Sequence, residues 1–185
     1  NAFQDLGKLD KAIEAYKNAI SFNPNYFEAY FNMGNALKLN GNIKEALVSY
    51  RTAISIKPDY ALAHNNIGNA FKDQGMIEEA VKFYKKAIFI KPDYAEAYNN
   101  MGLALHNQDK LDEAIKAYNK ALELKPDYAF AYNNMGVTLK EQGKLDQAIA
   151  AYDKTLSLKP DYAEAYNNMG IILVEQGKLE QAIEA

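Results

Sequence analysis

Cysteine is absent from the 185-residue chain, which excludes a disulfide framework, a thiolate metal site and a cysteine nucleophile. The redox compartment is left undetermined by this absence. Only two histidines occur, His64 and His106, and their separation matches no metal-ligand spacing. Glycines stand singly, so the sequence contains no phosphate-cradling loop. We therefore expect no cofactor, no metal centre and no catalytic site, and we assign both histidines to packing or simple exposure.

An excess of basic residues and a long apolar run are also missing. The net charge is −3, whereas a surface that binds nucleic-acid phosphates is basic. No apolar run approaches the ~20 residues that a membrane-spanning helix needs. The chain starts at Asn1 and has no signal-peptide pattern. We expect neither nucleic-acid binding nor membrane insertion. The sequence does not specify a compartment, and the cytoplasm is our expectation.

Proline is scarce, and its placement is regular. The five prolines occupy positions 24, 58, 92, 126 and 160, so every gap is 34 residues. The phrase PDYAEAYNNMG starts at Pro92 and again at Pro160, with near copies at the other three prolines. A fixed period of this length is typical of stacked repeats. We predict a single array with a partial unit at 1–26, full units at 27–60, 61–94, 95–128 and 129–162, and a partial unit at 163–185.

Each unit reads as two amphipathic helices joined by a tight turn. In residues 95–128, the small and apolar positions recur at helical spacing, first around Tyr98 and Gly102 and then around Ala114 and Tyr118. We expect Gly102 to allow close helix approach and Tyr118 to fill the wider gap. The turn position, which favours a left-handed residue, is occupied by Gly7, Gly41, Gly75, Asp109, Gly143 and Gly177.

The repeated phrase also predicts how each helix pair begins. Proline ends the preceding helix because it cannot continue one. Asp93 is placed as an N-cap, with Glu96 completing a capping box three residues later. The same arrangement recurs at Asp161 with Glu164, and at Asn25 with Glu28. Under this interpretation, helix capping is sufficient to explain these glutamates, without any contact with a ligand.

The unit resembles the tetratricopeptide repeat. The residues that carry the resemblance are Tyr98, Gly102, Ala114, Tyr118, Ala121 and Pro126, together with their equivalents in the other units. His64 departs from the pattern at the first aromatic position, and Thr155 departs at the last alanine. The resemblance covers the whole chain. It implies an all-α, right-handed superhelical solenoid of antiparallel helix pairs, whose first helices line a concave groove for a peptide or a protein.

Asparagine dominates the side of each first helix that faces away from the packing side. One row is invariant between units and comprises Asn32, Asn66, Asn100, Asn134 and Asn168. A second row stands beside it and comprises Asn65, Asn99, Asn133 and Asn167, with Phe31 in the remaining slot. An amide both donates and accepts, so such rows can hold an extended peptide backbone. The arrangement is similar to the asparagine ladder in the repeats of O-GlcNAc transferases. The alternative is that these amides bond neighbouring helices or are solvated.

Three functions follow from this interpretation. The first is a noncatalytic protein–protein interaction scaffold that binds an extended peptide or a partner protein in the groove. The second is the substrate-recruiting arm of a larger enzyme, such as a glycosyl- or sulfotransferase. The third is end-to-end self-association, because both ends stop within a repeat and lack a polar capping helix. For the same reason we interpret the chain as a piece of a longer protein.

Overall fold

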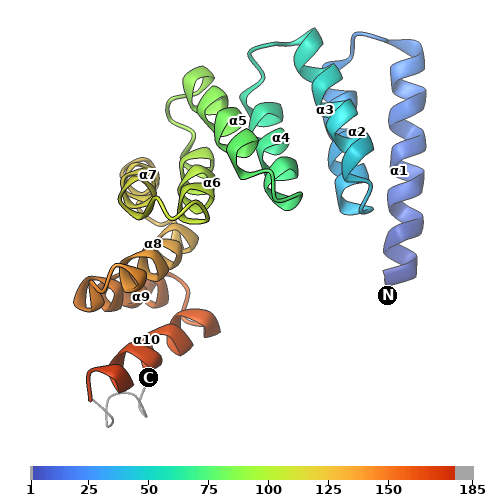
Figure 1. Ribbon diagram of the computed structural model, residues 1–185. Helices are drawn as coiled ribbons and strands as arrows, with labels where there is room; N and C mark the ends of the chain where they lie inside the picture. Colours follow the sequence, from blue (N-terminus) through green and yellow to red (C-terminus); the bar gives the residue numbers. More distant parts are fainter. Residues whose placement is uncertain (1, 178–185) are drawn as a thin grey trace. The chain divides into compact units, whose positions relative to one another are not determined.

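The computed structural model describes the backbone of residues 2–177 and the side chains of residues 7–177. The described residues form ten α-helices and no strand, which confirms the all-α prediction (Figure 1). The helices are α1 (Ala2–Phe22), α2 (Phe27–Leu39), α3 (Ile43–Ile56), α4 (Ala61–Asp73), α5 (Ile77–Ile90), α6 (Ala95–His106), α7 (Leu111–Leu124), α8 (Ala129–Glu141), α9 (Leu145–Leu158) and α10 (Ala163–Glu175). They fall into two compact units, unit 1 (Asn1–Pro92) and unit 2 (Asp93–Ala185).

Within each unit the helices pack as consecutive pairs. In unit 1, α2 packs against α3 and α4 against α5; in unit 2, α6 packs against α7 and α8 against α9. Each pair is joined by a short turn, so its two helices run antiparallel (Figure 1). We call α2, α4, α6, α8 and α10 the first helices, and α3, α5, α7 and α9 the second helices. The predicted helix–turn–helix units are confirmed.

A tyrosine ring on a glycine backbone holds each pair together. The four tyrosines that do this are fully buried: Tyr50, Tyr84, Tyr118 and Tyr152. A Cβ atom added to Gly102 would lie 2.6 Å from Tyr118 Cε1, which is closer than real Cβ contacts. Gly34, Gly68 and Gly136 meet the other three tyrosines in the same way. The predicted need for a small residue at Gly102 is confirmed, whereas the Tyr118 ring, expected in a wider gap, lies directly on that glycine.

The turns inside the pairs use a left-handed residue, as predicted. The backbone φ is positive at Gly41, Gly75, Gly143 and Gly177, and at Asp109, where it is 60°. Gly7 is the exception, because it lies inside the continuous helix α1. The prediction of a turn at Gly7 is therefore wrong. A continuous helix keeps its backbone hydrogen bonds. A turn breaks some of them, and that loss is compensated only where the two helices joined by the turn pack against each other.

The predicted capping boxes are wrong. The N-cap of α6 is Tyr94, one residue later than Asp93, and it makes no side-chain capping hydrogen bond. Tyr26 and Tyr162 likewise occupy the N-cap positions of α2 and α10, with no such bond. The glutamates contact neighbouring elements instead. Glu96 accepts from Lys125 Nζ at 3.4 Å, and Glu164 accepts from Asn133 Nδ2 at 3.3 Å.

Contacts within the loop explain why tyrosine takes this position. The Tyr128 N–H donates to the Lys125 carbonyl oxygen at 3.2 Å, which closes the loop around the proline. Lys125 Nζ then lies 4.9 Å from the centroid of the Tyr128 ring, a cation–π contact. Lys159 and Tyr162 repeat this contact at 5.1 Å. The contacts between the lysine before the proline and the tyrosine after it therefore stabilise the loop that connects one helix pair to the next.

His64 is buried in unit 1, as the packing interpretation predicts. Its side chain is 5% exposed, and its Nε2 lies 2.9 Å from the Pro58 carbonyl oxygen. Since a carbonyl only accepts, Nε2 carries the proton. Burial lowers the pKa of His64 below its usual value of 6.5. The folded protein therefore favours the neutral ring.

Replacing Gly102 with alanine tests the ring-on-glycine contact. We expect Gly102→Ala to lower the free energy of unfolding by about 1–3 kcal/mol, because the new methyl group overpacks the Tyr118 ring. Gly170→Ala is the matched control, since Gly170 holds the same repeat position but a Cβ atom added there would meet no described atom within 4 Å. Alanine is the better helix former, so this control should gain roughly 0.5–1 kcal/mol. Urea unfolding measures both values, and equal shifts in the two variants would contradict the packing argument.

Exchanging the turn residues of two repeats tests the left-handed backbone at Asp109. We expect Asp109→Gly to raise the free energy of unfolding by about 0.5–1 kcal/mol, because glycine adopts a positive φ without steric cost. Gly143→Asp is the reciprocal change, and we expect it to lower stability by a similar amount. Thermal or urea unfolding of both variants checks this prediction. Destabilisation by Asp109→Gly would show that the aspartate side chain contributes more than its backbone costs.

The neutral state of His64 predicts a dependence of stability on pH. Because its folded pKa is lowered, the contribution of His64 is complete above pH 6.5 and is lost as the pH falls below that value. Tyrosine occupies the equivalent position in the other repeats, so His64→Tyr should remove this component, and its crowding against Phe83 should change stability equally at every pH. Unfolding measured from pH 8 to pH 5 should give a flatter profile for the variant. Parallel profiles for the two proteins would refute the assignment.

Candidate functional site

Side chains link the first helices of each unit to one another. In unit 1, Asn66 Nδ2 on α4 donates to Asn35 Oδ1 on α2 at 2.8 Å. In unit 2, Asn134 Nδ2 on α8 donates to Asn99 Oδ1 on α6 at 3.0 Å. These bonds hold the amides of the invariant row in place. They also show that at least these two amides bond a neighbouring helix, which was the alternative interpretation of the sequence.

The invariant row keeps access to solvent. Asn32 is exposed, and the other four members, Asn66, Asn100, Asn134 and Asn168, are half-buried. An amide has two N–H donors and a carbonyl acceptor. Asn134 uses one N–H for its bond to Asn99, so one bond to a neighbouring helix does not exhaust its capacity. Asn66 and Asn134 are therefore bonded to a neighbouring helix and still accessible.

The second row lies differently from what the sequence indicates. Asn65, Asn99 and Asn133 are buried, with side chains 4%, 5% and 1% exposed, whereas Asn167 is exposed. We expected all four on the open side, but three of them are buried; Asn99 bonds α8 and Asn133 bonds α10. In the remaining slot of this row, Phe31 packs its ring 5.0 Å from that of Tyr60. The packed arc of a first helix is wider than one face because successive first helices also contact each other.

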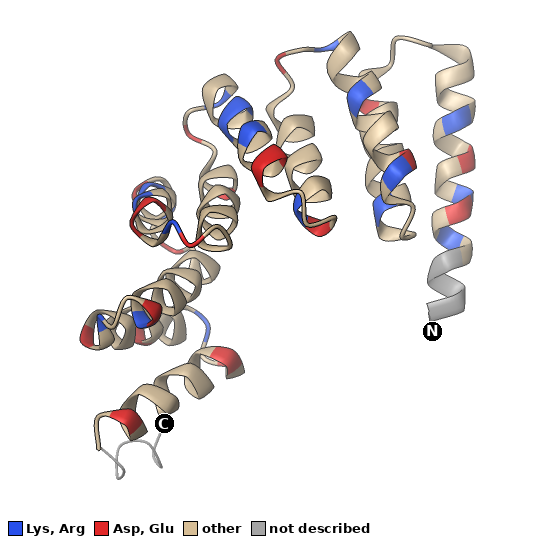
Figure 2. Ribbon diagram, in the orientation of Figure 1, with Lys and Arg blue, Asp and Glu red and all other residues tan. Residues whose placement is uncertain are grey.

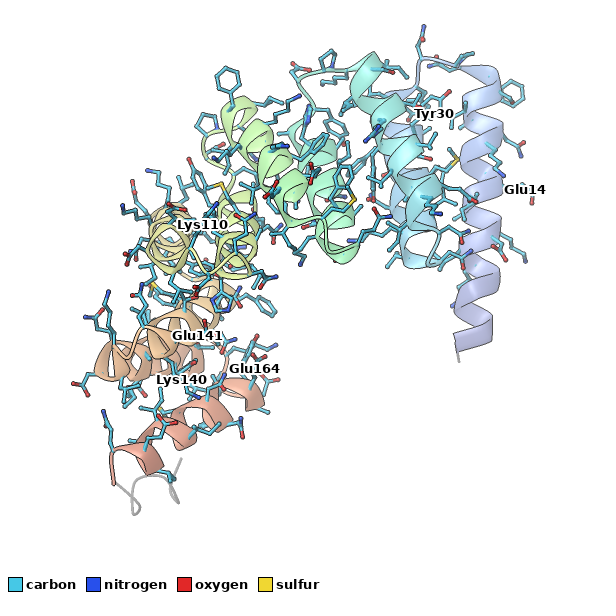
Figure 3. All side chains as sticks on the ribbon, in the orientation of Figure 1. Glu14, Tyr30, Lys110, Lys140, Glu141 and Glu164 are labelled. Atoms are coloured by element: carbon cyan, nitrogen blue, oxygen red, sulfur yellow. The ribbon has the colours of Figure 1, made fainter. Side chains whose placement is uncertain are left out.

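Further polar contacts join the C-terminal ends of the first helices. In unit 1, Lys38 on α2 and Asp73 on α4 form an ion pair of 2.9 Å. In unit 2, His106 on α6 lies 3.0 Å from the Thr138 hydroxyl and 3.5 Å from a Glu141 carboxylate oxygen, both on α8. Figure 3 labels Glu141 on α8 and Glu164 at the start of α10. These charged and polar groups serve contacts between helices.

The central turns of the first helices carry no charge. Their Asp, Glu and Lys residues occur only in the first and last turns, whereas the second helices carry charges along their length (Figure 2). The strip that contains the invariant asparagines is therefore polar but neutral. Such a strip suits a neutral, hydrogen-bonding ligand better than a charged one.

The residue next to the invariant row differs between the two units. In unit 1, Asn35 and Asn69 occupy this position and accept the hydroxyls of Tyr50 and Tyr84, each at 2.8 Å. In unit 2 the equivalent residues are Leu103, Val137 and Ile171. The Tyr152 hydroxyl, buried beside this position, has no hydrogen-bond partner among the described residues. Burial raises the pKa of Tyr50 to about 12, so these hydroxyls stay protonated.

The described residues contain no group of three or more His, Asp or Glu side chains that could hold a metal ion. Residues 2–177 also include no helix with both the length and the apolar character needed to cross a bilayer.

Sequence models of the tetratricopeptide repeat match the chain along its length. One, described as TPR repeat, matches residues 1–41, 34–75 and 68–109. Another, described as Tetratricopeptide repeat, matches residues 93–161 and 127–185. No curated protein matches the chain in sequence.

Solved structures of other repeat proteins share the fold. The chain is 29% identical to MamA, with a TM-score of 0.75 over 82% of this chain and 89% of MamA. It is 25% identical to YrrB, described as a TPR protein with an unusual peptide-binding site, with a TM-score of 0.74 over 93% and 89%. It is 26% identical to pilF of Pseudomonas aeruginosa, with a TM-score of 0.80 over 85% and 72%. With its 34-residue helix pairs and these matches, the chain belongs to the tetratricopeptide repeat family.

Proposed function

We propose that the chain is a noncatalytic interaction module in which the first helices of each unit hold an extended peptide. The observation that carries this proposal is the invariant row of accessible asparagines on an uncharged strip. The family supports it, since tetratricopeptide repeats typically mediate protein–protein interaction. The similarity to YrrB, a protein described as having a peptide-binding site, supports it as well.

Lateral bonding orients the amides before a ligand arrives. Asn66 and Asn134 are each held by a bond to the preceding first helix, so they lose less freedom when a peptide binds. The remaining amide groups then pair with backbone N–H and C=O groups of the peptide. One such hydrogen bond is worth only ~0.5–1.5 kcal/mol net, so binding depends on several of them acting together.

The flanking position gives the two units different preferences. In unit 2, Leu103, Val137 and Ile171 stand beside the row, and Ile171 is 39% exposed. In unit 1, Asn35 and Asn69 stand there instead. A peptide with apolar side chains on the segment bound by unit 2 fits this pattern. Recruitment to a larger enzyme and end-to-end self-association stay predictions from the sequence.

A triple substitution in the row tests the proposal. A peptide selected from an array of unmodified extended peptides should bind at least tenfold more weakly to the Asn66→Ala, Asn100→Ala, Asn134→Ala variant, because each unit loses backbone contacts. Titration calorimetry measures the affinity. We expect a moderate drop in melting temperature, because two bonds between first helices are lost as well.

The control replaces three exposed asparagines outside the row, Asn18, Asn42 and Asn107. It should keep the affinity of the wild-type protein. Equal affinity of the row variant and the wild-type protein would overturn the proposal.

A further inference from the structure

A cleft of about 500 Å³ lies in unit 2 between α7, α8 and α9. Ile115, Met135 and Leu139 line it with apolar surface, together with Ala151. Tyr132 and the exposed Lys154 also line it. The cleft is thus mainly apolar and has one cation at its edge.

The cleft is separate from the asparagine row. Tyr132, Met135 and Leu139 follow one another at i, i+3 and i+7 on α8, so they share one side of that helix. Asn134 lies about half a turn away, at roughly 200° from Tyr132 for a helix that advances ~100° per residue. A ligand in this cleft therefore does not use the row.

An internal comparison explains why the space exists. Ala151 on α9 has its counterpart in Phe83 on α5, two repeat periods earlier. The Phe83 ring lies 6.0 Å from that of His64 and 5.5 Å from that of Phe71, measured between centroids. The counterparts of His64 and Phe71 are Tyr132 and Leu139, and both line the cleft. In unit 1 an aromatic side chain of the protein itself occupies the place that is open in unit 2.

The cation at the edge has a counterpart as well. Lys86 Nζ lies 5.8 Å from the centroid of the Phe83 ring, within the range of a cation–π interaction. Lys154 is the equivalent residue and lines the cleft. A ring that enters the cleft therefore meets the same kind of surroundings that Phe83 has: an apolar floor, a flanking aromatic or aliphatic residue and a lysine.

We propose that this cleft binds an aromatic side chain, of phenylalanine size, carried by a partner peptide. The ring packs against Tyr132 and Leu139, over the small Ala151, and Lys154 lies at its face. The proposal goes beyond backbone binding by the asparagine row, because it assigns a second site of different chemistry on the other side of α8.

Methyl NMR tests the proposal directly. The chain has five methionines, so the Met135 methyl signal is easily resolved, and the other four act as internal references. The probes are blocked Gly-Phe-Gly tripeptides, with cyclohexylalanine or alanine replacing phenylalanine in the comparison peptides. We expect a saturable shift of the Met135 signal with phenylalanine, at least threefold weaker binding of cyclohexylalanine, and no shift with alanine. The absence of a shift with the phenylalanine peptide would overturn the proposal.

Two reciprocal variants extend the test. Ala151→Phe fills the cleft as Phe83 does in unit 1, and it should weaken the phenylalanine peptide at least tenfold. Phe83→Ala should open the equivalent space in unit 1 and add a second site, reported by the methyl groups of Ile67, the counterpart of Met135. Unchanged binding by folded Ala151→Phe would refute the assignment. If that variant does not fold, the lack of a second site in Phe83→Ala refutes it instead.

Lys154→Gln tests the cation alone, because Lys154 is exposed and its loss leaves the core intact. It should abolish the preference for phenylalanine over cyclohexylalanine, and an unchanged preference would contradict the role of the lysine. The triple variant of the asparagine row should bind the phenylalanine peptide as the wild-type protein does. Because the row variant changes only the backbone-binding site, its binding of the phenylalanine peptide distinguishes a failure of the cleft proposal from a failure of the backbone-binding proposal.

Discussion

The contact between a tyrosine ring and a glycine backbone is the constraint on which each helix pair depends. Tyr118 is completely buried, and Gly102 leaves no room for even a methyl group beneath it. Because this contact fixes how the first helix is rotated, it also fixes what the other side of that helix presents. Asn100 is two residues from Gly102, roughly 200° around the helix, so it faces away from the ring. The core contact thus positions the candidate binding row.

A second constraint acts between successive first helices. The bonds from Asn66 to Asn35 and from Asn134 to Asn99 use amides that the proposed function also assigns to a ligand. These two uses are compatible because an amide has more than one donor and an acceptor. In the second row Asn99 and Asn133 are buried, and Asn99 accepts the bond that orients Asn134. Under the proposed function, the same residue type serves packing and recognition at adjacent positions.

The sequence predicted the features that depend on hard local sterics. The small residue at Gly102 and the left-handed turn at Asp109 are of this kind, because each follows from the space or the backbone angle available at one residue. The packing of the Tyr118 ring on Gly102 was not predicted, because the helix pattern does not show which residues meet across a pair. The capping box expected at Asp93 was wrong because Tyr94 takes the N-cap position. In the loops at Pro126 and Pro160, the tyrosine N–H closes on the carbonyl of the lysine before the proline, which places tyrosine there. Burial of the second asparagine row was missed because a single helix pattern shows the packing against its partner, not the contacts with the next first helix.

The cleft at Ala151 shows how near-identical repeats acquire different surfaces. The residue beside it, Tyr152, is held by the glycine contact and tolerates no change in size. The Ala151 position varies in size: it is serine, phenylalanine or alanine in successive pairs, and in the α4–α5 pair the Phe83 side chain fills the space that is open at Ala151. A change from phenylalanine to alanine therefore opens a site without moving the helices that frame it. Because the frame is set elsewhere, the cleft and the asparagine row can vary independently on opposite sides of α8.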